Sequence, residues 1–305
     1  MERPSIRQLE SLVAVADHLN FRKAAEACYI TQPALSAQIQ QLEALLGVPL
    51  FERDRRRVVP TPAGRDLAEK ARRILVLVKE FGDSASPFKE PLTGDLKLGV
   101  IPTVAPYLLP GALAGVRTRF PRLRLHLHEA PTEVLVRQLE NGDLDLLLLA
   151  MEAELGDAET HPLFSDPFQL AVPAAHPLAK RKTVAESDLA NEDVLLLDDM
   201  HCLRDQALDI CHRTGMREKV DCRASSLSTL VQMVAGGLGV TLLPELALAV
   251  EVSPDRPLGL LRFRRIHPQR TIGLAWRPTS FRKDEFRLLG KAITASQRQI
   301  SATEE

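Results

Sequence analysis

The chain has few cysteines, almost no net charge and no long run of apolar residues. Its 305 residues include 4 cysteines, and 39 Lys and Arg nearly cancel 40 Asp and Glu, for a formal net charge of −1. So few thiols exclude a disulfide-stapled scaffold and favour a reducing cytosol. The overall charge balance indicates no class of partner, so any basic binding surface must be local.

No stretch approaches the roughly 20 apolar residues that a membrane-spanning helix needs. The first residues also lack a secretory signal pattern, because Glu2, Arg3, Arg7 and Glu10 interrupt every apolar run. We therefore expect a soluble, cytoplasmic protein. A chain of 305 residues has room for two or three domains with cores of their own.

The first sixty residues predict three helices. Ser5, Asn20 and Thr31 each precede an apolar pattern of helical spacing and are residues that favour the N-cap position. Pro33 falls in the first turn of the third helix, where its missing N–H does little harm, and Gly47 is expected to end that helix.

The third helix has one apolar and one polar face. Its inner face is predicted from the helical spacing of Leu35, Ile39, Leu42 and Leu46. Its outer face carries small or uncharged polar groups, which suit base edges and thymine methyls in a major groove. A solvated helix face is the alternative. The predicted DNA contacts on this face are Gln32, Pro33, Ser36, Ala37 and Gln40.

Two short extended runs surround a basic turn in residues 50–59. Arg53, Arg55 and Arg56 at this turn have the charge that a wing needs to contact phosphates, although a solvated turn is the alternative. Helix, helix, turn, helix and basic wing in this order are far more specific than any one part. We therefore predict an all-α winged helix-turn-helix DNA-binding domain over residues 1–60.

A long helix is predicted to begin at Thr61 and Pro62. Apolar residues then recur at steps of 4, 3, 4 and 3, the spacing of a two-stranded coiled-coil seam, at Leu67, Ala71, Ile74, Val78 and Phe81. Packing against a following domain is the alternative. We favour dimerisation, because a dimer matches two DNA half-sites. This linker helix and a hinge rich in Gly, Ser and Pro are assigned to residues 61–91.

From about residue 92 the pattern changes to alternating strands and helices, which predicts an α/β domain over residues 92–305 with a parallel sheet. The chain is expected to form lobe I from about 92–165 and 269–300 and lobe II from about 166–268. Two α/β lobes joined by crossovers would leave a cleft at the carboxyl ends of their strands. Thr103 and Thr132 follow predicted strands and fall where that cleft is expected, although Thr132 also suits a helix cap.

Two cysteines, Cys202 and Cys211, lie nine positions apart in a predicted short helix, with Asp199 as its cap and Gly215 as its stop. An unbroken helix would separate them by about 13–14 Å and turn the second side chain half a circle from the first. A disulfide needs Cα atoms within about 7 Å. These two thiols therefore either never meet or dismantle the helix when they do.

Cys202 is the candidate reactive thiol. It lies near the helix start between His201 and Arg204, surroundings expected to lower its pKa and to favour attack on a peroxide. Threonine hydroxyls beside it could hold the oxidant. An ordinary small apolar residue is the alternative.

Cys211 lies on the apolar face and is expected to be a buried thiol, as are Cys28 and Cys222. A zinc site built from His201, Cys202, Cys211 and His212 is disfavoured, because the short spacing of structural Cys pairs is missing.

The first ninety residues resemble the LysR-type transcriptional regulators. The matching stretches are Phe21-Arg22-Lys23-Ala24-Ala25, Thr31-Gln32-Pro33-Ala34-Leu35-Ser36, Leu42-Glu43, Leu50-Phe51-Glu52-Arg53 and Thr61-Pro62-Ala63-Gly64. The remainder is similar to the hydrogen-peroxide-sensing members of that family. That similarity is carried by Ile101-Pro102-Thr103-Val104-Ala105-Pro106-Tyr107-Leu108-Leu109-Pro110, His128-Glu129-Ala130-Pro131-Thr132, His201-Cys202-Leu203-Arg204-Asp205-Gln206-Ala207 and Arg270-Thr271-Ile272-Gly273-Leu274.

The resemblance implies two Rossmann-like lobes arranged as in type II periplasmic binding proteins. It also implies a peroxidatic Cys202 and a resolving Cys211 that form a reversible disulfide. The peroxide would be bound by Thr103, Thr132 and His201, and the site would be supported by Arg204, Asp205 and Arg270. One departure is Met200, which stands where a glycine is expected.

The resemblance further implies a non-enzymatic activator of antioxidant genes without cofactor or metal. It would assemble as a homodimer and then a homotetramer, bind promoter DNA and RNA polymerase, and be reduced by a glutaredoxin or thioredoxin system. Two rivals remain open. One is a LysR-type regulator that senses a small metabolite in the interlobe cleft, and the other is a thiol peroxidase with a DNA-binding head.

Overall fold

The computed structural model describes residues 3–53, 58–83, 91–190, 192–253, 257–264 and 267–303. The chain forms two compact units, and the N-terminal unit ends at residue 88. Among the described residues, none of the helices combines the length and the apolar character that crossing a membrane would require.

The N-terminal unit contains the predicted helices and a short hairpin. Its elements are α1 (Ile6–His18), α2 (Phe21–Ala27), α3 (Gln32–Leu46), β1 (Phe51–Arg53), β2 (Val58–Pro60) and α4 (Pro62–Asp83). The three predicted caps are confirmed: Ser5 closes a capping box with Gln8, Asn20 accepts from two backbone N–H groups, and Thr31 accepts from Ala34 N. Gly47 ends α3 with a φ of 70°, in the left-handed region where a side chain would be strained.

The core of this unit is made where α3 packs on α1 and α2, and where the first half of α4 packs on α1. Leu35, Ile39 and Leu42 of α3 are fully buried, as predicted. Leu46 is 36% exposed, so its predicted place on the inner face is wrong. Strands β1 and β2 pair antiparallel, with Phe51 opposite Pro60, and form the predicted two-stranded wing.

The C-terminal unit begins with the predicted βαβ run, which supplies lobe I. Its elements are β3 (Gly94–Val100), α5 (Ala105–Arg119), β4 (Leu123–Glu129), α6 (Thr132–Glu140) and β5 (Leu146–Ala150). Strands β4 and β5 flank β3 in parallel, as expected. The returning strand β12 (Gln269–Trp276) pairs antiparallel with β5, and α10 (Lys283–Thr303) packs on α5, so the whole sheet is mixed rather than parallel.

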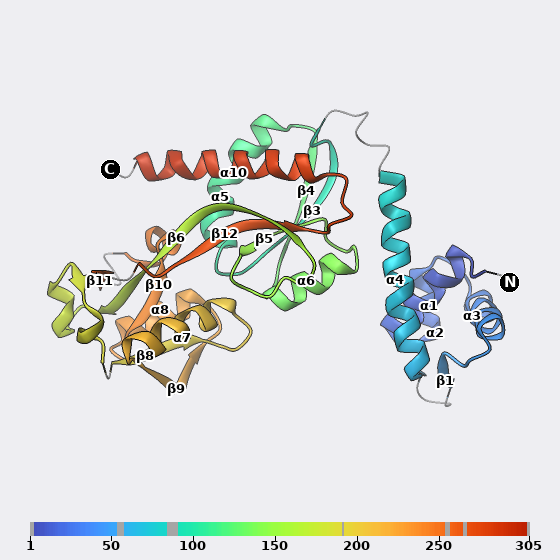
Figure 1. The fold of residues 1–305 in the computed structure, drawn as a ribbon, viewed down its shortest axis with the longest axis horizontal. Coiled ribbons are helices and arrows are strands. Elements are labelled where there is room, and N and C mark those ends of the chain that lie inside the picture. Colours follow the sequence, from blue (N-terminus) through green and yellow to red (C-terminus); the bar gives the residue numbers. More distant parts are fainter. Residues whose placement is uncertain are drawn as a thin grey trace. The chain divides into compact units, whose positions relative to one another are not determined.

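One long strand, β6 (Glu159–Pro173), joins the two lobes and was not predicted. It pairs with β12 over residues 159–167 and then, on its second half, with β10 (Thr241–Pro244) and β11 (Leu258–Phe263). Figure 1 shows β6 and β12 running side by side from one lobe towards the other. The boundary predicted at residue 166 therefore falls inside a continuous strand.

Lobe II is built on the second half of β6. Its remaining elements are two 3-10 helices (Pro177–Lys180 and Glu186–Asp188), β7 (Thr183–Val184), β8 (Asp193–Leu197), α7 (Cys202–Thr214), β9 (Arg217–Ala224), α8 (Leu227–Ala235) and α9 (Glu245–Glu251). Each lobe has a hydrophobic core of its own, one around the β3–β5 strands and one around β8, α7 and α8. The strand–helix alternation predicted from residue 92 is therefore confirmed in both lobes.

Candidate redox site

Helix α7 begins at Cys202 and runs unbroken to Thr214. Its N-cap is His201, whose side chain makes no capping hydrogen bond, so the prediction that Asp199 caps this helix is wrong. Gly215 ends the helix with a φ of 75°, as predicted. The uncapped first turn leaves backbone N–H groups at Cys202 without the side-chain partner that usually stabilises a helix start.

Cys202 and Cys211 are both free thiols, and they belong to different hydrophobic cores. Cys211 is 2% exposed in the core of lobe II, whereas the half-buried Cys202 packs against the core of lobe I. Nine residues of intact helix hold their Cα atoms about 13–14 Å apart. A disulfide between them therefore requires both the unwinding of α7 and the withdrawal of at least one sulfur from its core.

Four of the predicted site residues lie together around a small pocket. The pocket is lined by Ile101, Pro102, Thr103, Pro131, Thr132, Met200, His201 and Cys202. Thr103 follows β3 and Thr132 begins α6, so the carboxyl ends of two parallel strands bring these hydroxyls to the thiol. The pocket offers no space for a water-sized sphere in this arrangement.

Arg270 anchors this pocket from strand β12. Its guanidinium is completely buried and donates to Thr103 Oγ1 at 2.8 Å, to the Thr103 carbonyl at 2.9 Å and to Asp166 Oδ2 at 2.9 Å. The second oxygen of Asp166 accepts from Leu246 N at 2.9 Å. Sequence reasoning missed Asp166, because its contact with Arg270 joins residues 104 positions apart.

Burial raises the pKa of the Cys202 thiol above its ordinary value of 9.0. The Thr132 hydroxyl and the positive charge of Arg270 oppose this rise, whereas the charges of Asp205 and Glu152 add to it. The expectation of a lowered pKa is therefore wrong. The effect of desolvation on the pKa outweighs the stabilisation of the thiolate by the start of helix α7. The charge of the flanking Arg204 is directed to Asp199 and Glu218 instead of to Cys202.

Two predicted supporting residues lie away from the pocket. Arg204 is 8% exposed and contacts Glu218 Oε1 at 2.7 Å and Asp199 Oδ1 at 2.9 Å. Asp205 is exposed and reaches Cys202 only through its charge. Of the three residues assigned to support the site, Arg270 alone hydrogen-bonds a pocket residue.

Residues near Cys202 in the pocket wall or in helix α7 have buried polar atoms without a hydrogen-bond partner. Among the described residues, these atoms include Thr132 Oγ1 and both amide atoms of Gln206. The Thr132 hydroxyl nonetheless favours the Cys202 thiolate, because it lowers the pKa of that thiol against the effect of burial. Gln206 was missed, although its position one helical turn after Cys202 places it on the same face of α7.

His201 is held by its surroundings rather than free to rotate. Its side chain is buried, and Nε2 lies 3.1 Å from the Ser225 carbonyl and 3.5 Å from Asp198 Oδ1. A carbonyl can only accept, so Nε2 carries a proton in this arrangement. The imidazole is thereby fixed at the pocket wall beside Cys202.

The two remaining thiols are less buried than predicted. Cys28 and Cys222 are half-buried rather than buried, so that prediction is wrong for both. Within the described ranges, no three His, Cys, Asp or Glu side chains gather as metal ligands, and the His201, Cys202, Cys211 and His212 set is not assembled.

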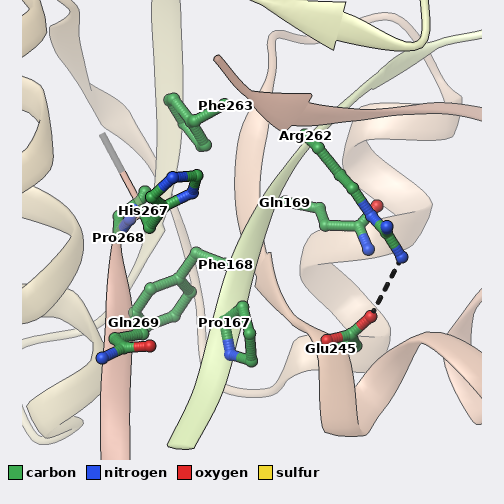
Figure 2. Close-up of a pocket in the computed structure, with 9 residues that line it drawn as sticks. All are labelled: Pro167, Phe168, Gln169, Glu245, Arg262, Phe263, His267, Pro268 and Gln269. Atoms are coloured by element: carbon green, nitrogen blue, oxygen red, sulfur yellow. Dashed lines mark hydrogen bonds and ion pairs between the residues drawn. The ribbon is translucent and has the colours of Figure 1, made fainter. Parts of the chain in front are cut away.

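A larger pocket of about 450 Å³ lies where β6, β11, β12 and α9 meet. Figure 2 shows Arg262 directed towards Glu245, 3.5 Å away, with Gln169 beside them and Phe168 and His267 across β6. The pocket contains none of the predicted site residues. Its lining residues are Pro167, Phe168, Gln169, Glu245, Arg262, Phe263, His267, Pro268 and Gln269.

The predicted DNA-contacting face of α3 points to solvent. Gln32, Pro33, Ala37 and Gln40 are exposed, and Ser36 is half-buried. Arg55 and Arg56 lie outside the described residues, as does the side chain of Arg53. On α4, Ile74, Val78 and Phe81 of the predicted seam are exposed, whereas Ala71 is buried in the N-terminal core.

Comparisons with known proteins agree with this architecture. Residues 6–65 match the bacterial regulatory helix-turn-helix protein, lysR family, and residues 89–297 match the LysR substrate binding domain. The chain is 45% identical over 291 residues to the DNA-binding transcriptional dual regulator OxyR of Escherichia coli, covering 95% of each chain.

Solved structures give the same relationship. A full-length OxyR variant from Pseudomonas aeruginosa is 32% identical with a TM-score of 0.77, over 96% of this chain and 95% of that one. A hydrogen-peroxide-bound OxyR variant from Corynebacterium glutamicum is 36% identical with a TM-score of 0.68, over 99% and 95%. Sequence match and fold together show that the chain belongs to the LysR family of bacterial transcriptional regulators, in its OxyR group.

Proposed function

We propose that this chain is a DNA-binding transcriptional regulator that senses hydrogen peroxide through Cys202 and switches by a reversible Cys202–Cys211 disulfide. The observation that carries the proposal is the placement of the two thiols at one helix but in two different hydrophobic cores. Joining them must rearrange the packing of both lobes, so the oxidation state of sulfur becomes a conformational signal. The names of the OxyR relatives support the same reading.

The chemistry needs two balanced steps. In the first, the Cys202 sulfur attacks one peroxide oxygen, the O–O bond breaks, and the thiol with hydrogen peroxide gives a sulfenic acid and water. In the second, the Cys211 sulfur displaces the sulfenic hydroxyl, and the disulfide forms with release of another water. Thr103, Thr132 and His201 are proposed to orient the oxidant, with the imidazole held at the pocket wall by its Nε2–H bond to the Ser225 carbonyl.

Entry of peroxide requires a small opening of the pocket, because no water-sized sphere fits there in this arrangement. Met200, 65% exposed, is the most exposed lining residue, and we propose that its side chain moves to admit the oxidant.

The regulatory output is proposed to follow the domain division expected from sequence, with DNA-binding residues 1–60, a dimerising linker 61–91 and the sensor 92–305. Exposed Ile74, Val78 and Phe81 on α4 support a dimer seam. We propose a cytoplasmic homodimer that assembles to a homotetramer, binds promoter DNA and RNA polymerase, and is reset by glutaredoxin or thioredoxin. Each event consumes one oxidant until reduction, so the protein acts as a sensor rather than an enzyme.

Mass spectrometry of peroxide-treated protein tests the proposal directly. We expect a peptide in which Cys202 is joined to Cys211, and its loss in both Cys202→Ser and Cys211→Ser, with a trappable sulfenic acid retained in Cys211→Ser. DNA affinity of reduced Cys202→Ser should match that of the reduced parent protein. Pairing of Cys202 with Cys28 or Cys222 would transfer the resolving role, and an unmodified Cys202 would overturn the proposal.

The larger pocket favours one rival, a regulator that senses a small metabolite. It lies where the strands cross between the lobes and has both aromatic and charged walls. Thermal denaturation of the reduced protein, measured with and without metabolite mixtures, distinguishes a peroxide sensor from a metabolite sensor. A peroxide sensor responds to oxidant without added metabolite, whereas a metabolite sensor is stabilised by a compound and retains its response in Cys202→Ser.

A further inference from the structure

Four charged side chains form a closed ring around the start of α7. Arg204 contacts Asp199 at 2.9 Å and Glu218 at 2.7 Å, and Arg223 contacts the same two carboxylates at 2.8 and 3.5 Å. Each cation therefore touches both anions. The Arg204 Nε–H is not aimed at Asp199, so that contact is electrostatic rather than a hydrogen bond.

The ring depends on an irregularity in strand β9. Glu218 lies opposite Val194 and Arg223 opposite Leu196, so five steps along β9 match two steps along β8. Residues five apart on a regular strand point to opposite faces, because side chains alternate. The three extra residues restore the parity and bring Glu218 and Arg223 to one face, where Glu218 meets Arg204 of α7 and Arg223 meets Asp199 just before that helix.

The ring holds the chain on both sides of Cys202. Asp199 precedes the thiol by three residues and Arg204 follows it by two, whereas Glu218 and Arg223 lie on β9 beyond Cys211. The Arg204–Glu218 contact is the more sheltered one, with side chains 10% and 18% exposed, and Asp199 at 70% is open to solvent. Most of the holding strength therefore resides in Arg204 and Glu218.

We propose that Glu218 and Arg223 are positioning residues for closure of the disulfide: through Arg204 and Asp199 they hold the first turn of α7 and must release it before Cys202 can reach Cys211. This inference rests on the proposed switch. Closing the disulfide pulls Cys202 out of the first turn of α7. Arg204, two residues further along that helix, then cannot keep its contact with Glu218 on β9. The ring therefore stabilises the dithiol state alone and sets both the closing rate and the reduction potential.

The test compares Glu218→Gln with the parent protein in two measurements. In a glutathione redox titration, the variant should shift the equilibrium about tenfold towards the disulfide, which lowers the reduction potential by about 30 mV. In quenched-flow experiments with mass spectrometry, its sulfenic acid should convert to disulfide several-fold faster. Sulfenic acid formation, measured in a Cys211→Ser background, should change less than twofold, because the pocket contacts of Cys202 do not involve the ring.

Salt provides a readout that a merely structural role would not give. Raising ionic strength from about 0.05 to about 0.5 M weakens exposed ion contacts. It should shift the parent titration towards disulfide by a smaller factor than Glu218→Gln does, because salt screens the exposed contacts of Asp199 more than the sheltered Arg204–Glu218 contact. Arg223→Gln, at the more exposed corner, should shift in the same direction by a smaller factor and serves as the second variant if Glu218→Gln folds poorly.

Asp188→Asn is the matched control, because Asp188 is similarly sheltered and forms an ion pair with Arg181 at 3.1 Å in the same lobe, outside the ring. It should leave potential, closing rate and salt response unchanged. The inference is overturned if the parent protein forms the disulfide but Glu218→Gln and Arg223→Gln both leave its potential and closing rate unaltered. A parent protein that forms no Cys202–Cys211 disulfide instead overturns the proposed switch itself.

Discussion

Arg270 and Asp166 form an ion pair at 2.9 Å with side chains 0% and 2% exposed. They are direct partners in the pairing of β12 with β6, at the point where these strands run between the lobes. The same guanidinium donates twice to Thr103, which lines the Cys202 pocket. One buried charge pair therefore connects the interlobe strands to the candidate redox site.

Asp166→Asn should lower the free energy of unfolding of the reduced protein by roughly 3–5 kcal/mol, because it leaves the Arg270 charge buried without its counter-ion. Chemical denaturation followed by circular dichroism measures the change. Asp284→Asn breaks an exposed pair with Arg287 on α10 and should leave the transition unmoved. Equal free energies of unfolding for Asp166→Asn and the parent protein would show that Asp166 does not stabilise the buried charge of Arg270.

The oxidation rate of Cys202 should rise with pH and show no plateau up to pH 9.0, because burial raises the pKa of its thiol above that value. The thiolate is the attacking form, and its fraction grows until pH exceeds the raised pKa. Trapping of sulfenic acid in Cys211→Ser at increasing pH measures the profile. Arg270→Gln should move the profile to still higher pH, since it removes a charge that favours the thiolate. A plateau near neutral pH would contradict the raised pKa.

Thr132→Val should slow sulfenic acid formation without destabilising the reduced protein. A hydrogen bond to a charged group contributes about 1.5–3 kcal/mol, which corresponds to a loss of roughly 10- to 100-fold in rate. The hydroxyl has no hydrogen-bond partner in the reduced protein, so its replacement by a methyl group removes no stabilising contact. Stopped-flow oxidation and thermal denaturation measure the two effects separately.

Thr118→Val is the control for this pair of measurements. The Thr118 hydroxyl donates only to the Ala114 carbonyl within α5, at an exposed position. Its substitution should leave the oxidation rate unchanged. If Thr132→Val instead unfolds the protein or oxidises at the parental rate, the hydroxyl is a structural group and not a donor to the reacting sulfur.

Local patterns made much of this architecture predictable. The caps at Ser5, Asn20 and Thr31 and the stop at Gly215 follow from chemistry within one turn of chain, and each was found where expected. The meeting of Thr103 and Thr132 was also predictable, because neighbouring parallel strands end at the same edge of a sheet.

Non-local pairing was not predictable from the sequence. The flanking positions of His201 and Arg204 suggested a lowered pKa for Cys202, but the charge of Arg204 is directed to Glu218, 14 positions along the chain on β9. Desolvation by the core of lobe I then decides the direction of the pKa shift. Strand β6 was missed for the same reason. Its first residues are polar, and its extent through residue 166 is defined by pairing with the distant strands β10, β11 and β12.

Gln32→Ala should weaken binding to the specific operator and spare binding to unrelated DNA. Gln32 lies exposed in the first turn of α3, and a glutamine that reads an adenine edge contributes about 1–3 kcal/mol of discrimination, or roughly 5- to 150-fold in affinity. Because the side chain carries no charge, the slope of log affinity against log salt should not change.

Lys70→Gln on α4, away from the predicted contact face, is the control and should leave sequence discrimination intact. Fluorescence anisotropy at several salt concentrations measures both quantities. Equal losses on specific and unrelated DNA would place Gln32 at the phosphates and not at a base, and an unchanged affinity for both would remove it from the interface.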